Sequence, residues 1–162
     1  MKTTAFKALF MMAACTVCGA LSAAEPNLEG MKRIYDFLKE AKCYYIATVD
    51  GDQPHVRPFG TILIFENRLY IQTGRKKNVG KQLIANGKVE LCAMKDKQVL
   101  RVTGTLIDDP RREAKAAMLD AYPGLKKMYS PDDDNTMVLY FQPGTVTSTI
   151  WSFSHDPIVM RF

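Results

Sequence analysis

The spacing of apolar positions changes along the chain and separates helices from strands. Between residues 31 and 42, apolar side chains recur every three or four positions, which predicts an amphipathic helix. Residues 43–49 are rich in aromatic and β-branched side chains and stop at Asp50-Gly51-Asp52, a pattern typical of a strand that enters a hairpin. Similar runs predict strands at 61–65, 69–73, 89–94, 99–107, 136–141, 145–152 and 158–162, an irregular or edge strand at 53–59, and helices at 78–86 and 110–121.

Most of these strands follow one another through short turns, and the helices are inserted between them. This order predicts a mainly β protein of the α+β class, built as a closed or nearly closed antiparallel barrel. A parallel α/β sheet is disfavoured, because strands and helices do not alternate regularly. At 162 residues the chain is long enough for about one ordinary domain. The third helix is expected to begin with Asp109 as its N-cap and Pro110 in its first turn.

The first 24 residues have the features of a signal peptide. Two lysines precede an uncharged apolar run over residues 8–21, and the small residues Ser22-Ala23-Ala24 follow it. The pattern predicts cleavage after Ala24, a bacterial protein exported to the periplasm or secreted, and no stable membrane insertion after cleavage. An uncleaved anchor and a lipid anchor on Cys15 are the alternatives. The domain proper then comprises residues 25–162.

Composition and charge narrow the functional class only a little. Apolar residues make up 47% and charged residues 24% of the chain, which excludes a disordered chain, a collagen-like repeat and a polytopic membrane protein. The formal net charge of +5 loses two units if Lys2 and Lys7 leave with the leader. Such a balance suits an anionic small molecule as well as nucleic acid. The motifs below lead us to predict a small-molecule substrate and no nucleic-acid partner.

Two of the four cysteines, Cys43 and Cys92, lie outside the leader. Each stands inside a strand-like apolar run, so we predict small buried thiols. A disulfide between them is the alternative in an oxidising compartment, because spacing alone does not decide the pairing.

Sequence signatures of the common catalytic and metal sites are missing. The chain has no Gly-x-Ser-x-Gly, no His-Glu-x-x-His and no Gly-x-x-x-x-Gly-Lys motif, so no catalytic residue is assigned. His55 and His155 are far apart and have no cysteine cluster beside them, so no metal site is predicted. The run Asp132-Asp133-Asp134 lacks the alternating spacing of a calcium loop and is expected to be a solvated loop.

The segment from Thr73 to Asn78 carries three adjacent cations between a predicted strand and a predicted helix. Unpaired backbone amides at a helix N-terminus, together with Lys or Arg, favour an anion such as a phosphate group. Thr73 adds a hydroxyl donor. The alternative is a plain solvated turn.

A second candidate segment runs from His55 to Gly60. It places Arg57 in an apolar strand, followed by Pro58-Phe59-Gly60. A cation beside backbone amides suits a planar polar ring. The alternative is an edge strand with one outward-facing arginine.

Several short segments between residues 31 and 155 keep a characteristic order and spacing. They are 45–51, 56–60, 69–73, 76–79, 82–83, 102–105 and 111–115. In this order they resemble the pyridoxamine 5'-phosphate oxidase-like, FMN-binding split-barrel proteins. The resemblance implies an antiparallel split β-barrel, noncovalently bound FMN, and a homodimer with FMN at the subunit interface.

The resemblance also implies roles for individual residues. Arg57 would contact the flavin, and Pro58, Phe59 and Gly60 would lie along its ring. The FMN phosphate would be held by Thr73, Lys76, Lys77 and Asn78. Trp151, the single tryptophan, stands where the family's late strand approaches the cofactor, and a buried core aromatic is its alternative role.

Two departures from the family pattern shape the expected function. Residues 150–162 lack the Arg-Leu-His-type closing motif of true pyridoxamine phosphate oxidases, so vitamin B6 synthesis is not expected. The sequence after Asp50-Gly51 does not match the pattern for covalent FMN attachment. We therefore expect an exported, FMN-dependent oxidoreductase that acts on an unidentified small substrate. The alternatives are a deazaflavin in place of FMN, a haem-binding split barrel with His55 or His155 as axial ligand, and a cofactor-free binding module.

Overall fold

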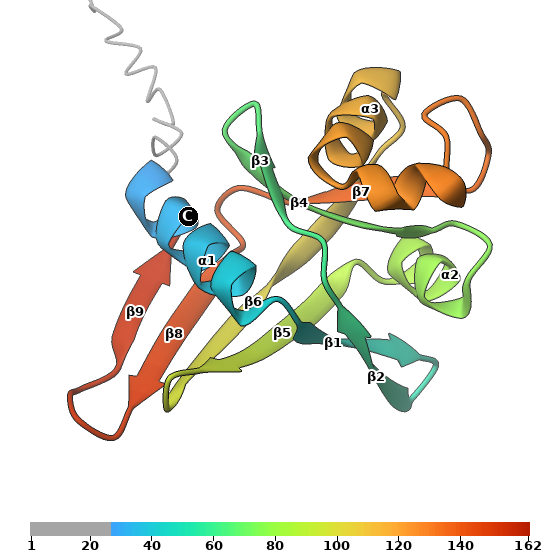
Figure 1. The fold of residues 1–162 in the computed structure, drawn as a ribbon. Coiled ribbons are helices and arrows are strands. Elements are labelled where there is room, and N and C mark those ends of the chain that lie inside the picture. The colour runs from blue at the N-terminus through green and yellow to red at the C-terminus, as the bar shows by residue number, and fades with distance from the viewer. Residues whose placement is uncertain (1–26) are drawn as a thin grey trace, which may run out of the picture.

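The structure, a computed structural model, describes residues 27–162, so the predicted signal peptide lies outside the described residues. Within this range no helix is long and apolar enough to cross a membrane. The helices are α1 (Leu28–Ala41), α2 (Asn78–Ala85), α3 (Arg112–Ala121) and the short 3-10 helix η1 (Pro123–Lys127) (Figure 1). The strands are β1 (Tyr44–Asp50), β2 (Gln53–Phe59), β3 (Leu63–Phe65), β4 (Arg68–Gly74), β5 (Lys88–Lys95), β6 (Gln98–Asp109), β7 (Thr136–Phe141), β8 (Thr147–Ser152) and β9 (Ile158–Arg161).

All strand pairs are antiparallel, and the main sheet runs in the order β2-β1-β5-β6-β7-β4-β3. The predicted mainly β, α+β class and the antiparallel split barrel are confirmed. Each predicted strand corresponds to an observed one. The segment 53–59 is a regular edge strand despite its two prolines, because it pairs with β1 along its whole length.

The long strand β6 is where the barrel splits. One edge of β6 pairs with β5, while its other edge pairs first with β8, up to Thr103, and then with β7, from Leu106 onward. Gly104 lies between the two stretches. A Cβ atom there would stand 2.9 Å from the ring of Phe141, so the missing side chain lets that ring pack against β6 where the partner strand changes.

The main hydrophobic core lies between the sheet and α1, which crosses the strands as Figure 1 shows. The amphipathic spacing seen in the sequence buries Ile34, Phe37 and Leu38 of this helix. Full burial of such a side chain stabilises the fold by roughly 1.5–3 kcal/mol. The N-cap of this helix is Asn27, whose side chain accepts a hydrogen bond from the Gly30 amide at 2.9 Å. A second cluster, around Met118 and Val138, packs α3 against the sheet.

The predicted start of the third helix is wrong. Asp109 is the last residue of β6, and Arg111 is the N-cap of α3, without a side-chain capping bond. The Asp109 side chain is buried and accepts hydrogen bonds from the Tyr70 hydroxyl at 2.9 Å and from the Arg111 guanidinium at 2.8 Å. Burial raises the pKa of Tyr70 to about 12. The Asp109 side chain thus binds the distant Tyr70 and the neighbouring Arg111, whose amide also donates to Oδ1 at 3.0 Å, and α3 begins two residues later than the local sequence predicts.

The prediction of buried thiols is also wrong. Cys43 and Cys92 are both exposed and free. In β5 the side chains alternate, so Leu91 and Ala93 face the core while Cys92 points outward from the sheet.

Candidate functional site

A pocket of about 350 Å³ lies where the end of β2, the end of β4, the start of α2 and the residues after η1 meet. Its volume is in the usual range for small-molecule sites. The pocket joins two segments that the sequence singled out separately, because Arg57 to Gly60 and Thr73 with Lys77 all line it. The other lining residues are Thr61, Gln72, Val79, Leu125, Met128 and Tyr129.

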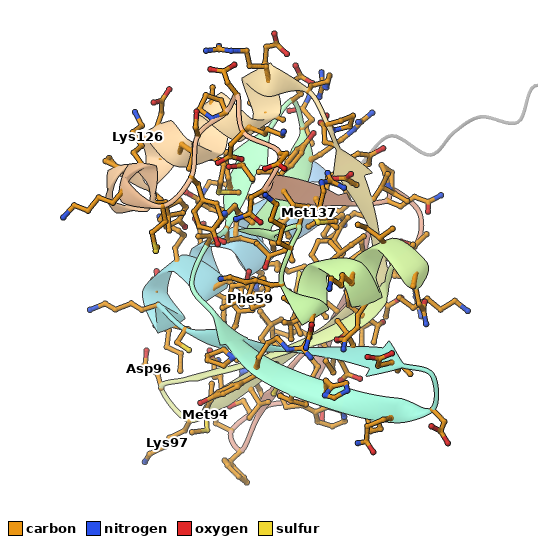
Figure 2. All side chains as sticks on the ribbon, turned by 90° about the vertical axis from the view of Figure 1, so that its right-hand side faces the viewer. Phe59, Met94, Asp96, Lys97, Lys126 and Met137 are labelled. Carbon is orange, nitrogen blue, oxygen red and sulfur yellow. The ribbon has the colours of Figure 1, made fainter. Side chains whose placement is uncertain are left out.

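Two tyrosines anchor the irregular segment that follows β2 and lines the pocket. The buried hydroxyl of Tyr44 donates to the Thr61 carbonyl at 2.6 Å. The Tyr122 hydroxyl accepts from the Ile62 amide and donates to the Ile62 carbonyl, both at 2.9 Å. Burial raises the pKa of Tyr44 well above its usual value, so this hydroxyl stays protonated and able to donate. Figure 2 shows Phe59, the last residue of β2, in the middle of the molecule, and Lys126 of η1 at its rim.

Arg57 is held by two buried neutral groups. Its Nη1 donates to Thr48 Oγ1 at 2.6 Å, and its Nη2 donates to Gln82 Oε1 at 3.0 Å. Thr48 also donates to the same Gln82 oxygen at 2.7 Å. Burial lowers the pKa of Arg57, although a guanidinium stays charged at any ordinary pH. Among residues 27–162 Arg57 forms no ion pair, so an oriented cation lines the pocket.

The three cations between β4 and α2 have different surroundings. Arg75 forms an ion pair with Asp108 at 2.7 Å, and Lys76 forms one with Asp134 at 2.9 Å. The ammonium of Lys77 instead lies 5.8 Å from the centre of the Tyr129 ring. Of the three, Lys77 alone lines the pocket. The segment is therefore a loop tied down by two ion pairs, and Lys77 is the cation of the three that lines the pocket.

The start of α2 lacks the usual capping groups. Its N-cap, Lys77, makes no side-chain capping bond, and its first turn has no acidic residue. The first amides of a helix have no partner within the helix, so this end attracts an anion. Gly80 sits in this first turn, where a Cβ atom would lie 2.5 Å from the Gly74 carbonyl oxygen. The missing side chain lets α2 begin directly against the end of β4.

The acidic run between η1 and β7 is more than a solvated loop. Asp132 pairs with Arg112 at 2.7 Å, and Asp134 pairs with Lys76. Asp133 accepts hydrogen bonds from the amides of residues 130, 135 and 136. Burial works in the opposite direction, but these amides outweigh it and lower the pKa of Asp133 to about 2. These contacts of the three carboxylates thus hold the loop in one conformation.

This loop in turn fixes the β4–α2 loop through Asn135. The Asn135 carbonyl accepts from the Arg75 amide at 2.7 Å, and its side-chain oxygen accepts from the Lys76 amide at 3.0 Å. The Lys77 amide donates to the Gly74 carbonyl at 3.1 Å. Since these amides have partners, the loop is held in place before any ligand arrives.

Three of the predicted site residues lie outside the pocket of this chain. Lys76 and Asn78 are exposed beside its rim, on the loop and at the first position of α2. Trp151 is on β8, opposite Val99, and is 50% exposed, so its alternative role as a buried core aromatic is wrong. It lies on the outer face of the sheet.

The two histidines stand apart from the pocket. His55 is half-buried on β2, and His155 is exposed between β8 and β9, 3.4 Å from the Gln98 side chain. Neither belongs to the pocket lining. In the described range, 27–162, no group of three or more His, Cys, Asp or Glu side chains is placed to hold a metal ion.

Sequence reasoning missed several residues of the site. Gln72 is polar within β4, a strand that is almost wholly buried, and this contrast was a signal that could have found it. Gln82 lies at a buried position of α2, where an amide also stands out. Met128 and Tyr129 follow η1, in a stretch without periodicity, and no sequence signal marked them.

Comparisons with known proteins agree with this fold. The family profile described as pyridoxamine 5'-phosphate oxidase matches residues 31–149. A NimC/NimA family protein from Clostridium acetobutylicum is 46% identical, with a TM-score of 0.78 over 82% of this chain and 92% of its own. No curated protein matches the chain.

More distant structures share the fold. General Stress Protein 26 from Bacillus anthracis is 19% identical, with a TM-score of 0.62 over 83% of this chain and 98% of its own. A heme binding protein from Mycobacterium smegmatis is 13% identical, with a TM-score of 0.61 over 85% of this chain and 59% of its own. From the family match and the 46% identity, the chain belongs to the pyridoxamine 5'-phosphate oxidase family of split-barrel proteins.

Proposed function

We propose that this chain binds FMN noncovalently in the pocket and works as a flavin-dependent oxidoreductase on a small substrate. One observation carries the proposal: two cations, Arg57 and Lys77, line the same pocket. Among residues 27–162, neither forms an ion pair with a carboxylate. Such a pocket favours a ligand with a negative group at one end and a polar ring at the other.

Different residues of the pocket would bind different parts of the ligand. Lys77, Thr73 and the first amides of α2 hold the phosphate. The segment from Pro58 to Gly60 would lie along the ring, and Arg57 would contact the ring's polar edge, since these residues line the pocket. When bound, the flavin supplies the electron transfer, while the protein supplies binding, orientation and charge. Leu125, Met128 and Tyr129 form a largely apolar wall on one side of the pocket.

A homodimer is part of the proposal. The outer face of the sheet exposes Tyr45, Val56, Cys92, Met94 and Trp151, which neighbouring strands bring onto one surface. Exposed apolar side chains gathered on one face are typical of a protein interface. A second copy related by a two-fold axis would cover it.

We also propose that the protein is exported, with its first 24 residues removed. The support is the leader's charge pattern, an uncharged run of residues 8–21 that ends in small residues. Pyridoxamine phosphate is not proposed as the substrate, because residues 150–162 lack the family's closing motif.

A haem-binding protein is the second candidate, supported by the fold shared with the mycobacterial heme binding protein. The pocket favours FMN over haem, since neither histidine lines it. Titration of the ligand-free chain with FMN, riboflavin and haem tests the choice. FMN is expected to bind most tightly and riboflavin more weakly. Tight haem binding with no response to FMN would overturn the proposal.

A further inference from the structure

Gln82 separates Arg57 from the nearest carboxylate of its hydrogen-bond network. The Gln82 side chain accepts from Arg57 with its oxygen and donates from Nε2 to Asp50 Oδ2 at 3.2 Å. Gln82 is 5% exposed and Thr48 is 2% exposed, so both hydrogen-bond partners of Arg57 are shielded from solvent. Other arginines of the chain are neutralised directly: Arg75 by Asp108, Arg101 by Glu90 and Arg112 by Asp132.

The neutral partners have two effects on Arg57. Two hydrogen bonds fix the direction of a side chain that otherwise has many rotamers. Because both acceptors are uncharged, they leave the positive charge of Arg57, a residue of the pocket lining, uncompensated. A carboxylate in the place of the Gln82 amide would form an ion pair with the guanidinium and cancel most of its field.

We infer that Gln82 is a positioning residue that aims Arg57 into the pocket while leaving its charge uncompensated, and that it thereby favours the reduced form of the bound flavin. Two-electron reduction adds negative charge to the flavin ring, so a fixed cation beside the ring binds the reduced form more tightly than the oxidised form. This inference rests on the proposed function, in which the ring lies beside Arg57.

The double variant Asp50→Asn with Gln82→Glu tests the inference. It exchanges the two side-chain types, so the net charge and the number of hydrogen bonds are kept, while one negative charge moves from position 50 to the oxygen that faces Arg57. We expect affinity for the reduced flavin to fall about tenfold more than affinity for the oxidised flavin. For a two-electron couple, that ratio corresponds to a midpoint potential about 30 mV lower.

Two controls separate positioning from general damage. Asp50→Asn alone removes a negative charge and leaves Gln82 in place, so the midpoint potential should not fall. In an Arg57→Ala background the double variant should leave the potential unchanged, because Gln82 acts through Arg57. Thr48→Val, which removes the other acceptor, is the second variant if the first does not fold, and should lower the potential by a smaller amount.

The outcomes are distinct. An unchanged midpoint potential in a folded, flavin-bound variant overturns the inference and leaves the proposed function intact. An equal fall in the Arg57→Ala background shows that the new carboxylate acts on the flavin directly, which also overturns it. If the unaltered chain binds no flavin, the proposed function fails and this inference fails with it.

Discussion

At the scale of single residues, ion pairing decides which cation serves the ligand. Lys76 and Lys77 are neighbours in sequence, yet Lys76 pairs with Asp134 and Lys77 lines the pocket. Lys77→Ala removes a charge-assisted contact to the phosphate, worth about 1.5–3 kcal/mol. We expect FMN to bind roughly 10- to 100-fold more weakly, while riboflavin, which lacks the phosphate, is unaffected. Fluorescence titration of both ligands measures this.

Lys76→Ala is the matched control, because it removes the same side chain one position earlier. Its FMN affinity should stay within about threefold of the unaltered chain, since a surface ion pair is worth little. A larger loss with Lys76→Ala than with Lys77→Ala would mean that the phosphate lies outside the described pocket.

Residue types were predictable here, but their surroundings were not. Arg57 and Lys77 stood out as cations beside a strand end and a helix start, and both line the pocket. The partner of Lys76 comes from a loop 58 residues away, and Trp151 is exposed by the pairing of its strand. No local sequence pattern predicts the partner of Lys76 or the exposure of Trp151, because both depend on how distant elements pack.

At the scale of elements, the close approach of α2 to β4 shapes the phosphate end of the pocket. Gly80→Ala would bring its Cβ against the carbonyl oxygens of Gly74 and Arg75, which are backbone atoms that cannot swing aside. We expect the variant to lose about 1–3 kcal/mol of stability and to bind FMN more weakly. Urea unfolding and FMN titration measure the two effects.

Gly124→Ala provides the control for that substitution. Nothing lies within 4 Å of the Cβ position at Gly124, so the same added methyl group should change neither stability nor FMN affinity appreciably. If both glycine variants behaved alike, the contact between α2 and the end of β4 would not be a constraint.

The acidic loop makes the stability of the fold depend on pH in the acidic range. The pKa of Asp133 is about 2, below its usual value near 3.9, so the stability from this carboxylate is fully present above pH 4. That stability is lost as the pH falls from about 4 towards 2. Asp133→Asn should flatten this part of the curve. Denaturant unfolding between pH 2 and pH 5 measures the stability of both proteins. An equal loss of stability in the unaltered chain and in Asp133→Asn would contradict the account.

The succession of elements follows largely from the sequence. Alternation and turn residues located all nine strands, apolar spacing located α1 and α2, and the pair Asp109-Pro110 signalled α3. Two features did not follow from local pattern. The local sequence predicts Asp109 as a helix cap, but its side chain accepts hydrogen bonds from Tyr70 and Arg111. The change of partner strand along β6 depends on where the Phe141 ring packs.

At the scale of the whole molecule, the outer sheet face predicts a dimer. Val56 is 66% exposed in the single chain, so Val56→Glu should leave the fold intact while placing a charge in the proposed interface. We expect the unaltered chain to be a dimer at micromolar concentration and the variant a monomer, as measured by light scattering. Leu28→Glu, on the exposed start of α1, should remain dimeric. A monomeric unaltered chain that still binds flavin would contradict the proposed interface.

The absorbance spectrum of the purified protein, recorded before and after denaturation, tests the central proposal most directly. Our account predicts flavin absorption bands in the native protein, and FMN released intact into the supernatant once the chain is denatured, because no covalent bond holds it. Bands that stayed with the precipitated chain would contradict noncovalent binding. A Soret band, or a colourless protein that takes up no added FMN, would contradict the proposal that the pocket between Arg57 and Lys77 is a flavin site.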